Sequence, residues 1–556
     1  MNHGNFMTDK HDEHTGSSKF QKFGLLLALA FYIVSVIMVF RIQRGGDILE
    51  KNVKTITFAH WSLEDGFREG FDEAIKLFEE YKAKQGQKVK VLQTTVPFSG
   101  YAQWFMTQLI GGDPADVIKI GASSDIQNQY FTPLSQYIGN PNPFNQGTPL
   151  EGVPWKDTYV DDMRGSLDWN YAEYYGVGIC VHTFRMYVNM ELLQKATGSR
   201  KLPRTLSEWL GICEKMREYG KKIGKPVIPV GVRGFDRGTI NSLLNYYQSQ
   251  LTADLNDTLP EFCGDISALD IFKGLEDGKI SRERQLAAVS VIAEIGKYFC
   301  DGFPSTDLEQ TKFLFFTGNV GFFPEGTWNA FSMINNSPFE VEIIDVPVIG
   351  PDHKYSKFFS GRPYEQGAVG AMFGIPKATK NFDLALEFLQ FITSWKINQM
   401  TMVEHCKWIA AVKKVKYTGI MAKMQPLPGS RRANAGFYFG FGTKSYKKVY
   451  ETIEESIISK TPEPQEYFWR DFISRIPEMH DEIIEIIENG KRNMLNIETM
   501  RSSAALGLKY SELSQQEAGR LRFRLQMNFE NLVARYKNSR NNIMLNSLLE
   551  NLKTEK

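Results

Sequence analysis

The sequence lacks the short motifs that mark the common enzyme and nucleic-acid-binding classes. It has no GxSxG nucleophile elbow, no HExxH, no P-loop and no GxGxxG. It also has no long Lys/Arg run, and its 65 basic and 64 acidic residues leave a formal net charge of +1. The charge pattern therefore gives no reason to expect a nucleic-acid partner.

Cysteine is scarce, with five residues in the whole chain. None forms a CxxC pair and no His stands at ligand spacing, which excludes a zinc ribbon and argues against a dense disulfide framework. No metal site is expected. Cys263 and Cys300 are candidates for one disulfide in an oxidising compartment, and the alternative is that all the cysteines are free and buried.

The chain is instead long and rich in aromatic residues. At 556 residues it exceeds one ordinary domain, so two large lobes with extra segments are expected. Aromatic residues make up 13% of the chain, which fits a large core and also fits a protein that stacks on planar or sugar-ring ligands.

One apolar run lies near the N-terminus. Residues 23–40, FGLLLALAFYIVSVIMVF, carry no charge and would cover about 27 Å as a helix, close to the thickness of the hydrocarbon core of a bilayer. The bulky, basic VIMVFRIQRGG, which ends the run and continues beyond it, contains no cleavage site. The sequence predicts an uncleaved transmembrane signal anchor at 23–41, a disordered tail at 1–22 and a linker at 42–53. A processed signal is the alternative.

From residue 54 the chain alternates strand and helix patterns. KTITFAHW predicts a strand, and the helical pattern after it ends near Gly86. KVKVLQTTV, YAQWFMTQLIGG and DPADVIKIG then predict a strand, a helix and a strand. This β-α-β-α-β order favours an open parallel sheet with ligands beyond the carboxyl ends of its strands, where Trp61, Ser123 and Ser124 lie.

Six segments, in order along residues 54–490, resemble the extracellular solute-binding proteins of ABC importers, most closely the sugar-binding group related to maltose-binding protein. The segments are ITFAHW…EAIKLFEEY with GGDPADVIKIG, YYGVGICVHTFRMYVNMELLQKA, LPRTLSEWLGICEKM, GNVGFFPEGTW, GAVGAMFGIPKATKNFDLALEFLQFITS and KWIAAVKKV. Cys180 and Ala410 stand where relatives often have Pro, and Val188 replaces a usual Tyr. These departures concern the ligand and the anchoring rather than the fold.

The resemblance implies an α/β fold, the two-lobed periplasmic-binding-protein clamp of type II. The chain would cross between lobes near Ile179–Arg185, Val341–Val348 and Lys407–Val412. Lobe one would hold 54–180 and 349–406, and lobe two 186–340 and 413–490. Such a clamp closes about a few hinge residues and buries its ligand between the lobes.

The stretch GFFPEGTWNA, residues 321–330, carries the main candidate site. It places Glu325 and Trp328 three residues apart at the end of an apolar strand. A Trp face stacks on the C–H face of a sugar ring, and a carboxylate accepts hydrogen bonds from hydroxyl groups. The resemblance implies the stacking role for Trp328. The alternative is a core Trp beside a helix-capping Glu.

Other candidates lie at expected strand ends, in the crossing strand and in two loops, VRGFDRG and NAGFYFGFG. They are expected to contact the ligand: Trp61, Ser123, His182, Arg233, Phe235, Tyr438 and Phe441. Structural roles are the alternatives, namely packing under the first helix for Trp61, helix capping for Ser123 and a satisfied structural group for His182. Trp408 is expected in the core.

The C-terminal segment, residues 491–556, extends beyond the resemblance. Apolar residues recur there at helical spacing, which predicts an amphipathic helical extension: Leu521, Leu525, Phe529, Leu532 and Val533. Packing on the lobe surface is favoured. Contact of its interleaved Arg residues with a permease or a membrane is the alternative.

The resemblance implies the substrate-binding component of an ABC importer, which is not an enzyme and needs no cofactor. It would capture a carbohydrate or related small solute and deliver it to permease subunits, facing the periplasm or cell exterior from its membrane anchor. Two alternatives remain: an anchored sugar receptor that feeds a sensor, and a glycoside hydrolase, since chance carboxylate pairs among 64 acids decide nothing.

Overall fold

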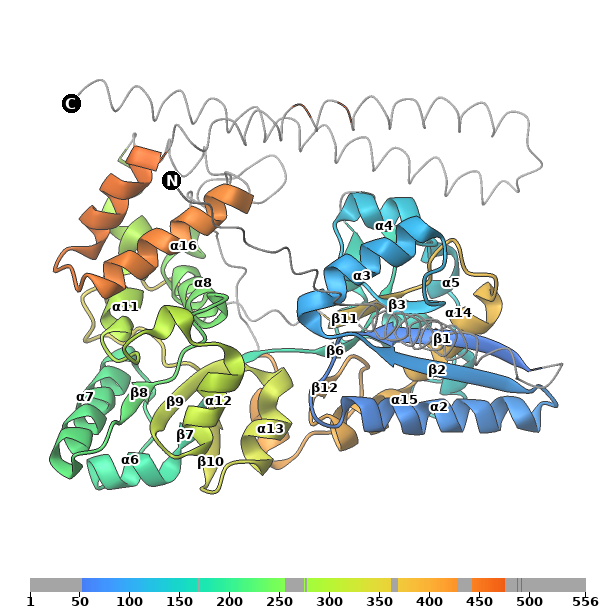
Figure 1. The fold of residues 1–556 in the computed structure, drawn as a ribbon, viewed down its shortest axis with the longest axis horizontal. Coiled ribbons are helices and arrows are strands. Elements are labelled where there is room, and N and C mark those ends of the chain that lie inside the picture. The colour runs from blue at the N-terminus through green and yellow to red at the C-terminus, as the bar shows by residue number, and fades with distance from the viewer. Residues whose placement is uncertain are drawn as a thin grey trace, which may run out of the picture. The chain divides into compact units, whose positions relative to one another are not determined.

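The computed structural model describes residues 53–475 with gaps at 169–170, 172, 256–274, 276–277, 362–368 and 428–442, together with residues 488 and 492. These residues form a two-lobed α/β fold built on a six-stranded and a four-stranded sheet (Figure 1). Among them, no helix is both long and apolar enough to span a bilayer.

The first lobe is built on the six-stranded sheet, whose strand order is β12-β6-β11-β3-β1-β2. In Figure 1, α3 and α4 lie on one side of this sheet and α2 on the other. Its main elements are β1 (Lys54–His60), α2 (Phe67–Lys84), β2 (Val89–Thr95), α3 (Phe98–Gly111), β3 (Val117–Lys119), α4 (Ser124–Tyr130), α5 (Ser135–Ile138), β6 (Val177–Val181), β11 (Val369–Gly374), α14 (Phe382–Ile392), α15 (Trp395–Asn398) and β12 (Ile409–Ala410). Short 3-10 turns and the β4–β5 pair (Leu167–Asp168, Glu173–Tyr174) join them.

The sheet of the first lobe is mixed, which corrects the expectation of a parallel sheet. β1 and β3 are parallel, as predicted, but β11 runs antiparallel to both β3 and β6. The reason lies in the topology: β6 leads out to the second sheet, and β11 enters the first sheet after the chain has passed through the second one. A pattern of alternating helices and strands does not report this long-range return.

The second lobe is built on the sheet β10-β7-β9-β8, in which β9 pairs antiparallel with β7 and parallel with β8. Its elements are β7 (Phe184–Asn189), α6 (Met190–Thr197), α7 (Leu206–Ile223), β8 (Ile228–Val230), α8 (Gly238–Thr252), α11 (Arg282–Gly296), α12 (Leu308–Phe316), β9 (Val320–Gly326), α13 (Ala330–Asn335), β10 (Val341–Ile344) and α16 (Thr443–Ile458). Thr205 caps α7 in a capping box with Glu208, which satisfies two backbone donors at the start of that helix.

The core around the second sheet gathers side chains from distant parts of the chain. Buried Trp209, Phe322 and Tyr247 pack with Tyr450 and Phe468, which come from α16 and from the helix at residues 464–475. Ile349 and Tyr355 also pack there. The segment after residue 349, expected in the first lobe, therefore packs with the second sheet before β11 joins the first.

The chain passes directly between the sheets at His182 and Thr183, which separate β6 from β7 within the predicted crossing. Thr183 donates through Oγ1 to the Met424 carbonyl (2.6 Å), and its backbone carbonyl accepts from Thr327 N (2.9 Å). The fully buried Arg185 donates to the carbonyl groups of Lys423 (2.9 Å) and Gln425 (2.5 Å). The first crossing is thus tied to the chain that follows β12.

Several expectations fall outside the described residues. These are the tail at 1–22, the anchor at 23–41, nearly all of the linker at 42–53, the C-terminal extension at 491–556 apart from residue 492, and Cys263 with its pairing to Cys300.

Candidate functional site

A cavity of about 670 Å³ lies where strand ends of both sheets meet, and the residues that line it all belong to one compact unit of the chain. Its aromatic lining consists of Trp61, Phe98, Trp328 and Trp408. Its polar and charged lining consists of Glu64, Asp65, Lys119, His182, Arg233, Asp236, Asp307, Glu309, Lys312, Asn329 and Ser332. This combination of an apolar wall and converging polar groups is typical of a small-molecule site.

The strands determine where these side chains lie. Trp61 directly follows β1 and Lys119 ends β3, so both stand at carboxyl ends of parallel strands. Arg233 follows β8, Trp328 follows β9, and His182 lies in the connection between β6 and β7. The cavity is therefore positioned by the sheets themselves.

Trp328 and Trp408 form an aromatic cluster around His182. The His182 ring meets Trp328 edge-on at 5.2 Å between centroids and Trp408 at 4.7 Å. Trp408 Nε1 donates to the Trp328 carbonyl (3.0 Å). Position 326 has room only for a glycine, because a Cβ there would lie 2.2 Å from the Trp328 ring. These contacts fix the orientation of the indole at the cavity.

Lys119 is the buried cation on the first-lobe wall, with its residue 5% exposed. Its Nζ donates to Ser62 Oγ (2.7 Å) and lies 4.0 Å from the Trp61 ring centroid, a cation–π contact. Burial lowers the Lys119 pKa to about 8, opposed by the negative charge of Glu64. Within the described residues this ammonium forms no ion pair, so the wall contains a charged donor with hydrogen-bonding capacity to spare.

Arg233 is the corresponding cation on the second-lobe wall, and it is surrounded by carboxylates. Its Nε lies 2.9 Å from Asp236 Oδ1 and its Nη1 lies 3.6 Å from Glu325 Oε2. Glu325 is 1% exposed and also accepts a hydrogen bond from Gly326 N (2.8 Å). Burial raises the Glu325 pKa and Arg233 opposes that rise. This wall therefore satisfies its charges internally.

The helix α12 closes the same wall with two further internal contacts. Asp307 caps α12 by accepting from Gln310 N (2.8 Å), and Lys312 pairs with Glu309 (3.1 Å). Lys312 is therefore paired with an opposite charge, and the Asp307 carboxylate is engaged at the start of the helix.

Four buried polar atoms of lining residues have no hydrogen-bond partner in the described chain. One is Arg233 Nε, which faces Asp236 in an ion pair, and the other three are Glu64 Oε2, His182 Nδ1 and Asn329 Nδ2. Burial together with the nearby Lys119 lowers the His182 pKa to about 3, so its ring is neutral at physiological pH. A buried polar atom without a partner costs on the order of 1–3 kcal/mol, which a ligand with donors and acceptors would offset.

The structure brings four of the predicted site residues together around the cavity: Trp61, His182, Arg233 and Trp328. Glu325 lies behind Arg233 rather than in the lining. Ser123 occupies the backbone capping position of α4 without a side-chain capping bond, and neither it nor Ser124 lines the cavity. Phe235 is 69% exposed, outside the lining.

Two predicted residues, Tyr438 and Phe441, lie outside the described residues. Among those described, no group of His, Cys, Asp and Glu is arranged to hold a metal ion. Trp408 is 1% exposed, as expected of a core residue, yet it also borders the cavity.

The family model of the bacterial extracellular solute-binding proteins matches residues 61–398. The chain belongs to this family. The second sheet, four of the six strands of the first sheet and every lining residue of the cavity except Trp408 fall within the matched segment, so the family's two-lobed architecture accounts for the position of the cavity. No curated protein matches the chain in sequence.

Solved structures of family proteins share the fold at low sequence identity. A solute-binding protein from Thermotoga lettingae bound with α-D-tagatose has a TM-score of 0.54 at 15% identity, covering 75% of this chain and 97% of that one. The GacH receptor of Streptomyces glaucescens has 0.53 at 17%, covering 77% and 99%. RafE in complex with raffinose has 0.51 at 17%, covering 75% and 97%. About a quarter of this chain lies outside each match.

Lys119, Glu64 and Asn329 were not among the predicted site residues. Lys119 could have been predicted from the sequence. It is the lone Lys of the apolar strand VIKI, next to a predicted strand end, and such a position indicates a buried charge with a functional role. Glu64 follows Trp61 by three residues in a loop, and no pattern in the sequence distinguishes it from a solvent-exposed acid.

Proposed function

We propose that this protein is the substrate-binding component of an ABC importer and that it holds a carbohydrate in the cavity between Trp61 and Trp328. The observation that carries the proposal is the pairing of aromatic faces with unsatisfied polar atoms in one cavity. Indole faces match the C–H faces of a sugar ring, while Glu64, His182, Asn329 and Lys119 match its hydroxyl and ring oxygens.

The relatives support the same assignment. RafE is described in complex with raffinose, GacH in complex with acarbose, and the Thermotoga protein with α-D-tagatose. Homologues of this kind are receptors rather than enzymes, so ATP hydrolysis would belong to a separate subunit and no cofactor is needed. The protein would face the periplasm or the cell exterior, held by the 23–41 anchor, and deliver its ligand to permease subunits.

The roles of the site residues follow from their surroundings. Trp328 and Trp61 would supply the stacking faces, and Lys119 and Glu64 a donor and an acceptor for neighbouring hydroxyls. Glu325 would act through Arg233, whose guanidinium it holds at the wall.

The test is a thermal-shift screen of the full chain against raffinose, acarbose, D-galactose and D-tagatose. A sugar at about 100 times its dissociation constant should stabilise the folded state by about 2.7 kcal/mol. The same screen is repeated with Trp328→Ala, which should lose the response. Hydrolysis of the sugar during the assay would instead favour the glycoside hydrolase, and a sugar response that survives Trp328→Ala would remove the stacking role.

A further inference from the structure

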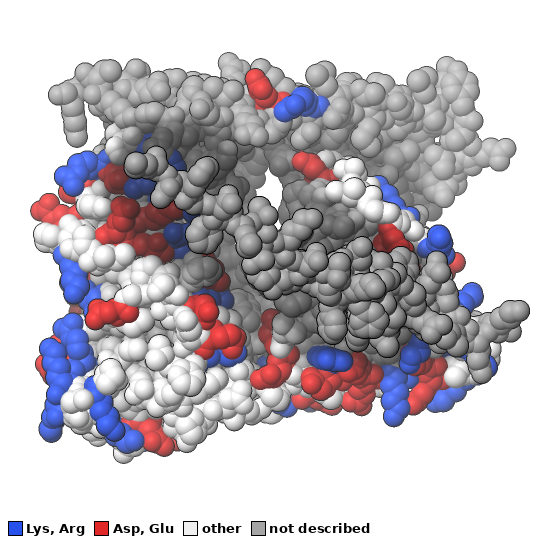
Figure 2. Space-filling model, viewed as in Figure 1, with Lys and Arg blue, Asp and Glu red and all other residues white. Residues whose placement is uncertain are grey.

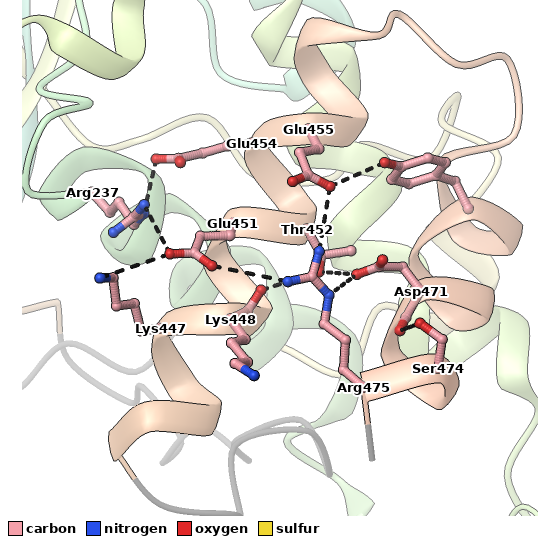
Figure 3. Close-up of polar contacts among 11 residues, drawn as sticks. Arg237, Lys447, Lys448, Glu451, Thr452, Glu454, Glu455, Asp471, Ser474 and Arg475 are labelled. Carbon is pink, nitrogen blue, oxygen red and sulfur yellow. Dashed lines mark hydrogen bonds and ion pairs between the residues drawn. The ribbon is translucent and has the colours of Figure 1, made fainter. Parts of the chain in front are cut away.

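The loop at residues 233–238 contributes to two different environments. It leaves β8 and enters α8, and its Arg233 and Asp236 side chains line the cavity. The side chain of Arg237 points toward α16 instead (Figure 3). Arg237 Nε lies 3.0 Å from Glu454 Oε1, and Nη2 lies 3.8 Å from Glu451 Oε1.

The backbone of this loop is held in a demanding conformation. Arg237 has φ +60°, in the left-handed region that costs a residue with a Cβ roughly 1 kcal/mol. Gly238 has no space for a side chain, because an ideal Cβ there would meet the Arg233 guanidinium at 1.9 Å. Gly238 N also donates to Asp236 Oδ1 (2.9 Å). The positions of Arg233 and Asp236 thus depend on the turn at Arg237.

The Arg237 side chain forms ion pairs with an acidic cluster on α16. Glu451, Glu454 and Glu455 lie within one helical turn, and Figure 2 shows acidic and basic side chains gathered together on the face that carries this helix. Burial raises the Glu454 pKa and Arg237 opposes that rise. Glu454 has a side chain only 10% exposed, so it gains most from the guanidinium beside it.

The cluster is itself anchored to the helix at residues 464–475. Arg475 pairs with Asp471 (2.6 Å), Glu455 (3.5 Å) and Glu451 (3.9 Å), and Thr452 hydrogen-bonds to Asp471. Buried Phe468 and Phe472 of the same helix pack into the core of the second lobe. The partner of Arg237 is therefore a fixed element and not a free surface side chain.

We infer that Arg237 is a positioning residue for the cavity. Its ion pairs with Glu454 and Glu451 hold the 233–238 turn so that the paired Arg233 and Asp236 keep their places in the cavity wall, and α16 thereby tunes affinity from outside the cavity. The inference rests on the proposed function for its ligand and on the described contacts for its geometry.

The deciding variants are made in the full chain. Arg237→Asn removes the guanidinium but keeps a residue that tolerates the left-handed conformation, and Arg237→Lys keeps the charge. Arg200→Asn is the control, because Arg200 forms an ion pair with Glu340 (2.6 Å) on the same lobe, more exposed than the Arg237 pair, and lies outside the lining. Glu454→Gln, alone and with Arg237→Asn, completes a double-mutant cycle.

The first measurement is amide hydrogen exchange without any sugar. Gly234 N and Phe235 N donate to the Thr306 carbonyl (3.0 and 3.1 Å), so their protection reports the turn. We expect faster exchange at these amides in Arg237→Asn, recovery in Arg237→Lys and no change in Arg200→Asn. Exchange in Arg237→Asn that equals the wild type would overturn the inference.

The second measurement is the dissociation constant for raffinose, acarbose, D-galactose and D-tagatose. We expect Arg237→Asn to weaken binding of the responding sugar about tenfold, with partial rescue by Arg237→Lys and no additional loss in the double variant. Unchanged affinity, with altered exchange, would reduce Arg237 to a structural contact and overturn its positioning role. If no sugar binds the wild type, the proposed function fails, while the exchange result still decides whether Arg237 holds the turn.

Discussion

The two walls of the cavity differ in how their buried charges are compensated. On the second-lobe wall, Arg233 is paired with Asp236 and Glu325 within the protein. On the first-lobe wall, Lys119 donates to Ser62 and stacks on Trp61 but forms no ion pair within the described residues. Glu64, on that same wall, keeps an unpartnered oxygen.

The paired Arg233 stabilises the site, whereas Lys119, unpaired in the described part of the chain, is available to bind a ligand. A buried ion pair is costly to break, because the remaining charge is left without compensation. A single buried ammonium is costly to keep, since its desolvation is only partly offset. Removing the paired charge of Arg233 should therefore affect mainly stability, and removing the unpaired charge of Lys119 should affect mainly binding.

The largest effect is expected from Arg233→Met. It leaves the Glu325 carboxylate buried with one backbone donor, and this should lower the free energy of unfolding by about 3 kcal/mol. Urea unfolding of the full chain at neutral pH measures the loss. The double variant Arg233→Met with Glu325→Gln should recover most of it, because the amide removes the charge and still accepts from Gly326 N. A double variant as unstable as the single one would show that lost packing, and not the uncompensated charge, lowers the free energy of unfolding.

Trp328→Ala should rank next, with its main effect on binding. Removing the indole deletes the stacking face and the contact with His182, so the sugar-induced stabilisation of about 2.7 kcal/mol should disappear. Thermal shift with and without sugar measures it. Trp209→Phe, a change in the core of the second lobe away from the lining, is the control and should keep the sugar response.

Lys119→Met tests the other wall. The Met side chain fills similar space without the desolvated charge, so the free energy of unfolding at neutral pH should rise rather than fall, whereas sugar affinity should fall. The wild type should also become more stable as the pH rises from about 8 to about 10.5, because the unfolded chain holds a proton that folded Lys119 releases. The variant should lack this rise. A destabilisation as large as that of Arg233→Met would erase the distinction between the walls.

Much of this arrangement could be predicted from the sequence. The strand–helix alternation and the family resemblance placed Trp61, His182 and Trp328 near one another, because each lies beside a strand end or in the crossing strand. Arg233 was predicted from a loop motif alone. These residues have local signals, such as a Gly-Thr-Trp turn or a crossing strand, that can be recognised without knowledge of the packing.

What could not be predicted depends on partners distant in the chain. Glu325 was expected at the ligand, but Arg233, 92 positions earlier, occupies the space in front of it. The tie between Arg237 and Glu454 joins segments more than 200 residues apart, and no periodicity reports such a pair. The tertiary fold determines which charged groups pair, so the position of a carboxylate in the sequence does not predict which cation it will contact.

At neutral pH the smallest effect should come from His182, whose ring contacts both tryptophans. Its folded-state pKa is lowered to about 3 by burial and by Lys119, while an unfolded His titrates near 6.5. As the pH falls below about 6.5, the unfolded chain takes up a proton that the folded chain refuses, so stability should decline by at most about 1.4 kcal/mol per pH unit from this group. His182→Gln removes the group, and urea unfolding between about pH 7 and pH 4 should show a shallower decline. The variant and the wild type declining in parallel would mean that His182 is protonated in the folded state, and the neutral ring assigned to the cavity would then be wrong.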